Sequence, residues 1–246
     1  AMRQTGYAAL VPGSHEFDYG LDVLNKRQTE AEFPFLGSNI RAKQGMDLPI
    51  EGYRSFTFGR VKVGVVGVVS KDLGRQIDPK VAERLVFEDP KKPLIEALKT
   101  LEDVGVDFVV LLAHMPEQEI LRLVEEVEGV DLVIAGGDRN VGREKRLPTL
   151  TRLASGVEVV TTPAGGANLG LVRLIFEKEQ TSVQRLRMTA EVVLIDGTNQ
   201  PHPQIASSVE RLFEMYQKET GDVLGIIEGK TLEAQVGAVA NLMRWH

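Results

Sequence analysis

The chain has 246 residues, 43% of them hydrophobic, with a net charge of −6 and a sequence pI near 5.4. This length and composition are typical of a globular protein with a sizeable core. The acidic balance gives no sign of a basic face, so we expect no nucleic-acid partner. The longest apolar run, residues 63–69, is too short to predict a membrane span.

The chain contains no cysteine, which excludes disulfides, thiolate metal ligands and cysteine nucleophiles. Histidine is also scarce. Any metal centre rich in imidazole would have to draw on four residues: His15, His114, His202 and His246.

The first third of the chain predicts short elements separated by glycine and proline. Gly6 has the position of a helix C-cap, and Gly59-Arg60 between two β-rich runs is typical of a hairpin. In chain order we expect the last turn of a helix over 1–7, a strand over 8–11, a helix over 16–26, a strand over 35–40, and hairpin strands over 56–58 and 61–69.

The middle third alternates strands with helices, which predicts parallel pairing and right-handed crossovers. Asp89-Pro90 marks a helix start, and the apolar stripe that follows it is Leu94, Ile95, Leu98, Leu101 and Val104. The later predicted elements are a strand over 108–113, a helix over 116–127, strands over 131–135, 157–161, 169–176 and 183–194, and a helix over 203–220.

Functional groups follow several predicted strands, at the edge where open α/β sheets bind ligands. Gly13-Ser14-His15 follows strand 8–11, His114 follows strand 108–113, and Gly136 to Arg139 follows strand 131–135. A fourth loop, 161–166, is placed to close over them. The glycine pairs Gly165-Gly166 and Gly136-Gly137 match neither the P-loop motif nor the dinucleotide-binding fingerprint. The simpler interpretation is that these glycines form turns.

The order and spacing of these segments resemble the calcineurin-like metallophosphoesterases, and within them the 5'-nucleotidase family. The most specific match is 13–20, Gly-Ser-His-Glu-Phe-Asp-Tyr-Gly, which is similar to the family's Gly-Asn-His-Glu-Phe-Asp signature. Weaker matches follow in the family's order at 33–40, 62–70, 113–114 and 131–137.

This resemblance implies an α/β fold, a four-layer αββα sandwich of metallophosphoesterase type with mixed sheets. We expect the sandwich to occupy residues 1–221 and to lack the family's N-terminal strand and metal motifs. Residues 222–246 would then be a tail or the start of a linker to a C-terminal domain.

In that family a pair of divalent metals (Mn, Zn or Mg) clamps the phosphate ester, and the loop histidine stabilises charge on the phosphoryl group. By resemblance, His15 and Asp18 are the catalytic candidates, and His114 is the matching metal ligand. The family's other metal ligands within the matched segments are replaced by Ser14, Gly137 and Arg139. Because one histidine cannot hold two ions, we expect the metal pair not to be retained.

Each candidate also has a simpler interpretation. His15 and Asp18 fit the start of a helix, and His114 fits a strand-end histidine satisfied by local hydrogen bonds. Arg139 would place a fixed positive charge where a metal ligand is expected, which suggests an anion-binding residue for phosphate. The alternative is an exposed loop arginine paired with a neighbouring carboxylate.

The resemblance therefore implies a 5'-nucleotidase-like phosphoester hydrolase domain with weak or no metal-dependent activity. The alternative is a pseudoenzyme, a non-catalytic module of the same fold that binds an anion or a partner protein. A third option is a site completed by a C-terminal domain or partner chain. The expected ligand is a phosphorylated small molecule or inorganic phosphate. Family members are usually exported, which implies a periplasmic or secreted location.

Overall fold

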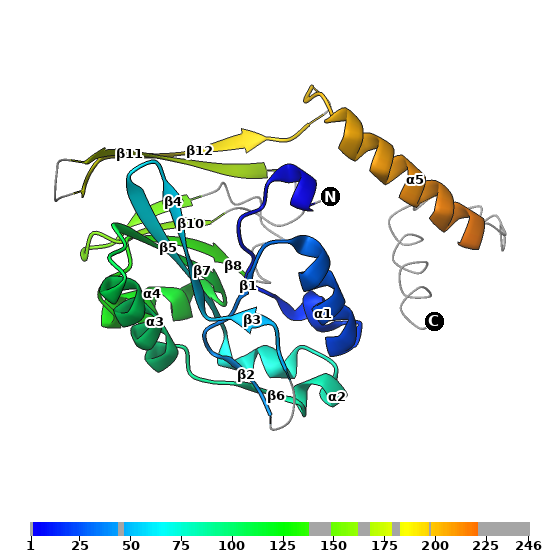
Figure 1. The fold of residues 1–246 in the computed structure, drawn as a ribbon, viewed down its shortest axis with the longest axis horizontal. Helices are drawn as coiled ribbons and strands as arrows, with labels where there is room; N and C mark the ends of the chain where they lie inside the picture. The colour runs from blue at the N-terminus through cyan, green and yellow to red at the C-terminus, as the bar shows by residue number, and fades with distance from the viewer. Residues whose placement is uncertain are drawn as a thin grey trace, which may run out of the picture. The chain divides into compact units, whose positions relative to one another are not determined.

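The computed structural model describes residues 2–43, 47–137, 149–161, 168–178, 183–196 and 198–220. The chain divides into two units, Ala1–Gln200 and Pro201–His246. Among the described elements, the first unit holds all the strands and every helix but α5 (Figure 1). None of the described helices is long and apolar enough to cross a membrane.

The first unit is built around a six-stranded sheet with the order β4-β5-β7-β8-β10-β9. Its four central strands run parallel, and β4 and β9 pair antiparallel at the two edges. The strands are β4 Tyr53–Phe58, β5 Val61–Val69, β7 Phe108–His114, β8 Leu132–Gly136, β9 Thr149–Arg152 and β10 Glu158–Thr161. The predicted parallel pairing is confirmed, as is the hairpin at Gly59, where φ is +61°.

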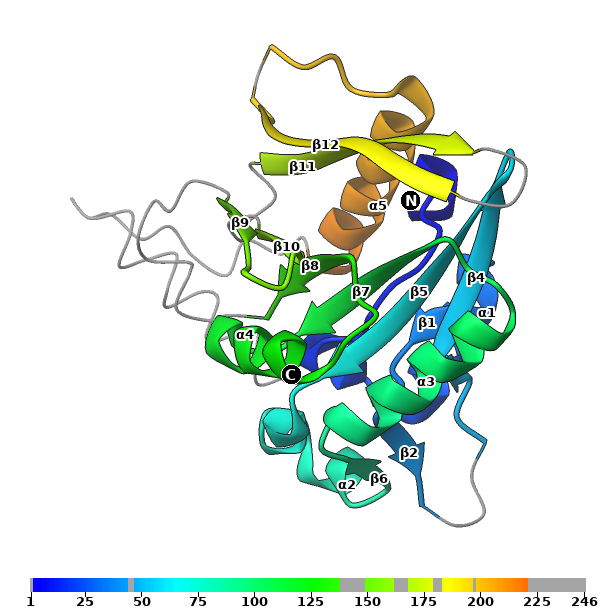
Figure 2. The ribbon, with the colours of Figure 1, turned by 90° about the vertical axis from the view of Figure 1, so that its left-hand side faces the viewer.

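Helices α3 (Lys91–Asp103) and α4 (Glu117–Glu126) cover one face of this sheet (Figure 2). Leu94, Leu101 and Ile120 are fully buried in the core that the helices form with β5, β7 and β8. The helix stripe is narrower than the sequence predicts, because Ile95 and Val104 are 46% and 48% exposed.

The expected N-terminal signal of α3 has a direct structural counterpart. The Asp89 Oδ1 atom accepts a hydrogen bond from the Lys91 N–H group over 3.1 Å. The carboxylate thereby satisfies one of the amide groups that have no partner within the first turn of a helix.

The opposite face of the sheet packs against an antiparallel ribbon of β11 (Asn168–Lys178) and β12 (Val183–Leu194). Phe108 of β7 meets Phe176 of β11 edge to face, with ring centroids 5.4 Å apart. Helices, main sheet and ribbon therefore form successive layers, an α/β arrangement with several sheets, as predicted (Figure 2).

The N-terminal part of this unit consists of short elements around a second core. Phe17, Leu21 and Leu73 are buried there. β1 pairs with β3 in parallel, and β2 pairs with β6 antiparallel. The elements are η1 Met2–Thr5, η2 Ser14–Phe17, α1 Gly20–Ala31, β1 Phe35–Leu36, β2 Ile40–Ala42, β3 Ile50–Glu51, η3 Lys71–Arg75, α2 Pro79–Ala82 and β6 Leu85–Phe87.

Three sequence predictions in this part are wrong. Segment 8–11 forms no strand: its pairing with β1 is limited to one isolated bridge at Leu10. Segment 35–40 is divided by a turn into β1 and β2, which belong to different sheets. The helix predicted over 16–26 begins later, at Gly20, where a φ of +81° separates α1 from the short η2 helix.

The second unit contains the described helix α5, Pro203–Thr220. This confirms the helix that the sequence predicts over 203–220. The expected domain boundary at residue 221 adjoins residues outside the described part of the chain, and it stays a prediction.

Candidate functional site

The ends of β5, β7 and β8 lie in register at one edge of the main sheet. Val69 pairs with His114, and His114 pairs with Gly136. The His114 ring also borders the loop that begins at Gly13, since a Cβ atom built on Gly13 would lie 2.6 Å from its Cε1 atom. The structure therefore brings together three of the segments that the sequence singles out.

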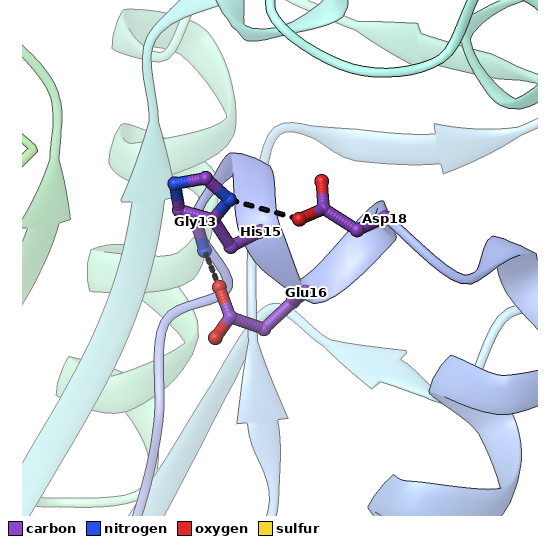
Figure 3. A network of polar contacts seen from close by, with 4 residues as sticks. All are labelled: Gly13, His15, Glu16 and Asp18. Atoms are coloured by element: carbon purple, nitrogen blue, oxygen red, sulfur yellow. Dashed lines mark hydrogen bonds and ion pairs between the residues drawn. The ribbon is translucent and has the colours of Figure 1, made fainter. Parts of the chain in front are cut away.

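The loop after Gly13 is held by one polar and one apolar anchor. The Glu16 Oε2 atom accepts a hydrogen bond from the Gly13 N–H group over 2.7 Å (Figure 3). Phe17 is fully buried and meets Phe87 edge to face, with ring centroids 6.1 Å apart. The Glu-Phe pair of the signature thus fixes the backbone on which His15 sits.

His15 and Asp18 form a polar pair on this loop. The Nδ1 atom of His15 lies 2.9 Å from Asp18 Oδ2 (Figure 3), and the two side chains are 82% and 48% exposed. A carboxylate at Nδ1 fixes the ring orientation and favours the tautomer with a proton on Nδ1. Nε2 is then the ring atom left to contact a ligand.

Ser70, which the sequence pattern did not single out, links the site to the sheet. Its N–H group donates to the His114 carbonyl over 3.1 Å, and its hydroxyl donates to Glu119 Oε2 over 3.1 Å. On the other side of His114, the Met115 N–H group donates to the Gly136 carbonyl over 3.0 Å. The backbone that carries His114 is therefore tied to both neighbouring strands.

Asn39 was also missed as a site-supporting residue. Its side chain is fully buried and donates from Nδ2 to the carbonyls of Val69 and Glu88 over 2.8 and 2.9 Å. Its Oδ1 atom accepts from the Val69 N–H group over 2.9 Å. Asn39 lies between the apolar residues Leu36 and Ile40, and this is the signal that would have identified it, because buried polar groups need partners.

A groove of about 810 Å³ opens beside His15. Phe33 and Tyr19 contribute aromatic lining, and Arg3 and Arg27 line the groove as ion pairs with Glu32 and Glu30. Its volume lies within the roughly 300–1,000 Å³ range of small-molecule sites. The groove therefore offers room for a ligand that reaches His15.

The family resemblance implies a pair of divalent metals, which would need several carboxylate and imidazole ligands at this edge. Within the described ranges no group of three His, Asp, Glu or Cys side chains converges on a metal position. Of the residues at the lost ligand positions, Ser14 is buried and Gly137 has no side chain and lies against the His114 ring. The described residues do not fit a two-metal centre. Arg139 and the loop 162–167 lie outside the described part of the chain.

Curated relatives cover most of this chain. A snake venom 5'-nucleotidase from Gloydius brevicauda is 27% identical over 252 aligned positions, which span 94% of this chain and 42% of the relative. The chain thus spans less than half the length of that enzyme. No protein-family profile matches the chain.

Solved structures have the same fold. The calcineurin-like phosphoesterase YfkN from Bacillus subtilis superposes with a TM-score of 0.76 at 21% identity, covering 90% of this chain and 74% of that one. A 5'-nucleotidase precursor from Thermus thermophilus gives 0.72 at 24% identity, covering 92% and 46%. The predicted fold class is confirmed: this is the α/β fold of the calcineurin-like phosphoesterases. In sequence the chain is similar to 5'-nucleotidases, at 27% identity for the enzymes from Gloydius brevicauda and Bos taurus.

Proposed function

We propose that this chain supplies the phosphate-facing part of a hydrolase site for nucleotide-type phosphoesters. The observation that carries the proposal is the pairing of His15 with Asp18 on a loop that packs against His114 at the strand ends. The relatives named as 5'-nucleotidases support the substrate class. The groove beside His15 would receive the rest of the substrate.

In this proposal His15 acts on the phosphoryl group. Asp18 accepts from the Nδ1–H group, and in the doubly protonated ring Nε2 also carries a hydrogen, which it donates to a phosphoryl oxygen as negative charge builds there. Because the loop is anchored at Glu16 and Phe17, little reorganisation accompanies this contact. Asp18 is thus a positioning residue, and His15 is the group that touches substrate.

We further propose that the chain has weak or no metal-dependent activity with the residues described. His114 matches a family ligand, but the described residues bring no second and third metal-binding side chain beside it. No step of the proposed chemistry is therefore assigned to a metal. Donors from a C-terminal domain or partner chain would change this expectation.

A non-catalytic module that binds phosphate is the second candidate. Two observations favour it. The ring of His15 is exposed and held by the Asp18 carboxylate, and the described ranges contain no group of side chains that could hold a metal ion. Arg139 remains the proposed additional anion contact, and it lies outside the described residues. A periplasmic or secreted location also remains a prediction, supported by the venom enzymes among the relatives.

The test combines metal content with turnover. The chain is dialysed against Mn²⁺ or Zn²⁺, its bound metal is quantified, and hydrolysis of a nucleoside 5'-monophosphate is followed. We expect less than two ions per chain and slow hydrolysis, which His15→Gln lowers by roughly 100-fold and His202→Gln leaves unchanged.

The outcomes separate the parts of the proposal. Two tightly bound ions with rapid turnover would overturn the weak-activity proposal. Turnover that is indifferent to His15→Gln would overturn the role of His15. If the chain binds phosphate but does not hydrolyse the ester, and His15→Gln abolishes that binding, the non-catalytic module would be favoured.

A further inference from the structure

The imidazole of His114 is enclosed by two glycines from different loops. A Cβ atom built on Gly13 would lie 2.6, 2.9 and 3.1 Å from the Cε1, Nε2 and Nδ1 atoms of the ring. A Cβ atom built on Gly137 would lie 2.9 Å from Cδ2 of the same ring and 2.9 Å from the backbone nitrogen of Met115. Cβ atoms in proteins essentially never come within 3.0 Å of such atoms, so the ring occupies space that any other residue would need.

The backbone at Gly13 does not itself demand glycine. Its φ of −98° and ψ of −168° form an extended conformation that any residue can adopt. Space beside His114 is therefore the constraint at this position. At Gly137 a φ of +89° adds a backbone constraint to the steric one.

A third glycine at the same edge provides the contrast. Gly136 adjoins Gly137, yet a Cβ atom built on it meets nothing within 4 Å. The closeness to His114 is thus specific to Gly13 and Gly137, and it is not a general property of glycines at the strand ends.

We infer that Gly13 and Gly137 are positioning residues, which fix the orientation of the His114 ring between the η2 loop and the end of β8. The consequence for turnover rests on the proposed phosphoester function, whereas the geometry does not.

If Gly13 is replaced by a larger residue, the His114 ring is the group that has to move. The backbone of His114 is tied to Ser70 on one strand, and Met115 is tied to Gly136 on the other. The η2 loop is anchored by the buried Phe17. At Gly13 the three nearest atoms all belong to the His114 side chain, so a methyl group there would rotate this ring and leave the fold intact.

Nuclear magnetic resonance of the histidine rings tests this inference directly. The chain has only four histidines, so each ring signal can be assigned by single replacement with glutamine. In the unsubstituted chain we expect a nuclear Overhauser effect between the His114 Hε1 proton and the Gly13 Hα protons. Gly13→Ala should remove that contact and shift the His114 ring signals, and the matched Gly136→Ala should do neither.

Turnover is measured as a second readout. A displacement of about 1 Å beside a reacting group can cost about 100-fold in rate. Because the His114 ring borders the loop that carries His15, we expect Gly13→Ala to reduce nucleoside monophosphate hydrolysis by this order. Loss of the ring contact without a change in hydrolysis would support the positioning role and count against the proposed function of the site.

Two results would overturn the inference. One is an unsubstituted chain that lacks the contact between His114 and Gly13, which can be observed even where variants fail to fold. The other is a folded Gly13→Ala chain with unchanged His114 signals.

Discussion

Replacing Asn39 by alanine removes the polar link between the end of β5 and the segment after β6. The side chain makes three hydrogen bonds, two to Val69 and one to Glu88, and it is fully buried. In the variant the Val69 N–H group loses its acceptor, and the Val69 and Glu88 carbonyls lose their side-chain donor. Because Ser70 follows Val69 and holds the His114 carbonyl, the change also loosens the candidate site.

The size of the effect follows from the number of bonds lost. Each buried hydrogen bond contributes about 1 kcal/mol net, so Asn39→Ala should lower the free energy of unfolding by about 3 kcal/mol. For a chain of this length each kcal/mol corresponds to roughly 2–4 °C, which predicts a fall in Tm of about 6–12 °C.

Thermal and urea unfolding followed by circular dichroism measure this change. Asn25→Ala is the matched control, because the Asn25 Oδ1 atom is buried without a hydrogen-bond partner in the described structure. We expect that control to change the free energy of unfolding by less than about 1 kcal/mol. If the two variants are equally stable, the reasoning about Asn39 is refuted.

Three further predictions concern packing and charge. Gly67→Ala should lower the free energy of unfolding by at least about 3 kcal/mol, because the new Cβ atom would lie 2.2 Å from the Leu36 carbonyl oxygen. Urea unfolding measures this change, with Gly136→Ala as the control because a Cβ atom there meets nothing within 4 Å. Phe17→Ala should cost about 3–5 kcal/mol and release the η2 loop, which calorimetry and proteolysis of the loop can follow; a loop as protected as before would contradict this. Hydrogen bonds from Thr198 lower the pKa of Asp196, so their contribution to stability is present above the unfolded pKa and is lost as pH falls through the folded pKa. Thr198→Val should raise the pKa of Asp196 toward its ordinary value in a carboxyl titration by nuclear magnetic resonance, and an unchanged pKa would refute the assignment.

The four parallel strands of the main sheet could be predicted from the sequence because they are apolar, whereas the edge strand β9 was not predicted. The run 61–69 and the strand over 108–113 alternate with amphipathic helices, and this pattern leaves parallel pairing as the natural arrangement. The short N-terminal elements were harder to predict. Leu10 makes only a single bridge, so the strand predicted over 8–11 lacks a partner. Segment 35–40 turns at Gly37-Ser38-Asn39, a local turn signal that the apolar residues on either side obscured.

The candidate site was predicted only in part. The strand-end rule correctly indicates that His114 and Gly137 share one edge. The Gly13 loop also lies there, although the strand predicted before it is not formed. The rule gives no hint that two glycines enclose the His114 ring, because that contact depends on the packing of loops that are far apart in the sequence. The support from Ser70 and Asn39 was missed for the same reason: their hydrogen bonds join segments that are distant along the chain.

Titration of the chain with a nucleoside 5'-monophosphate, followed through its four histidine ring signals, tests the central claim most directly. If the edge at the Gly13 loop binds the phosphoryl group, the signals of His15 and His114 shift in proportion to ligand bound, and those of His202 stay fixed. Inorganic phosphate should produce the same pattern at higher concentration, because it shares the group that His15 is proposed to contact. Saturable binding that leaves the His15 and His114 signals unmoved would contradict the location of the site.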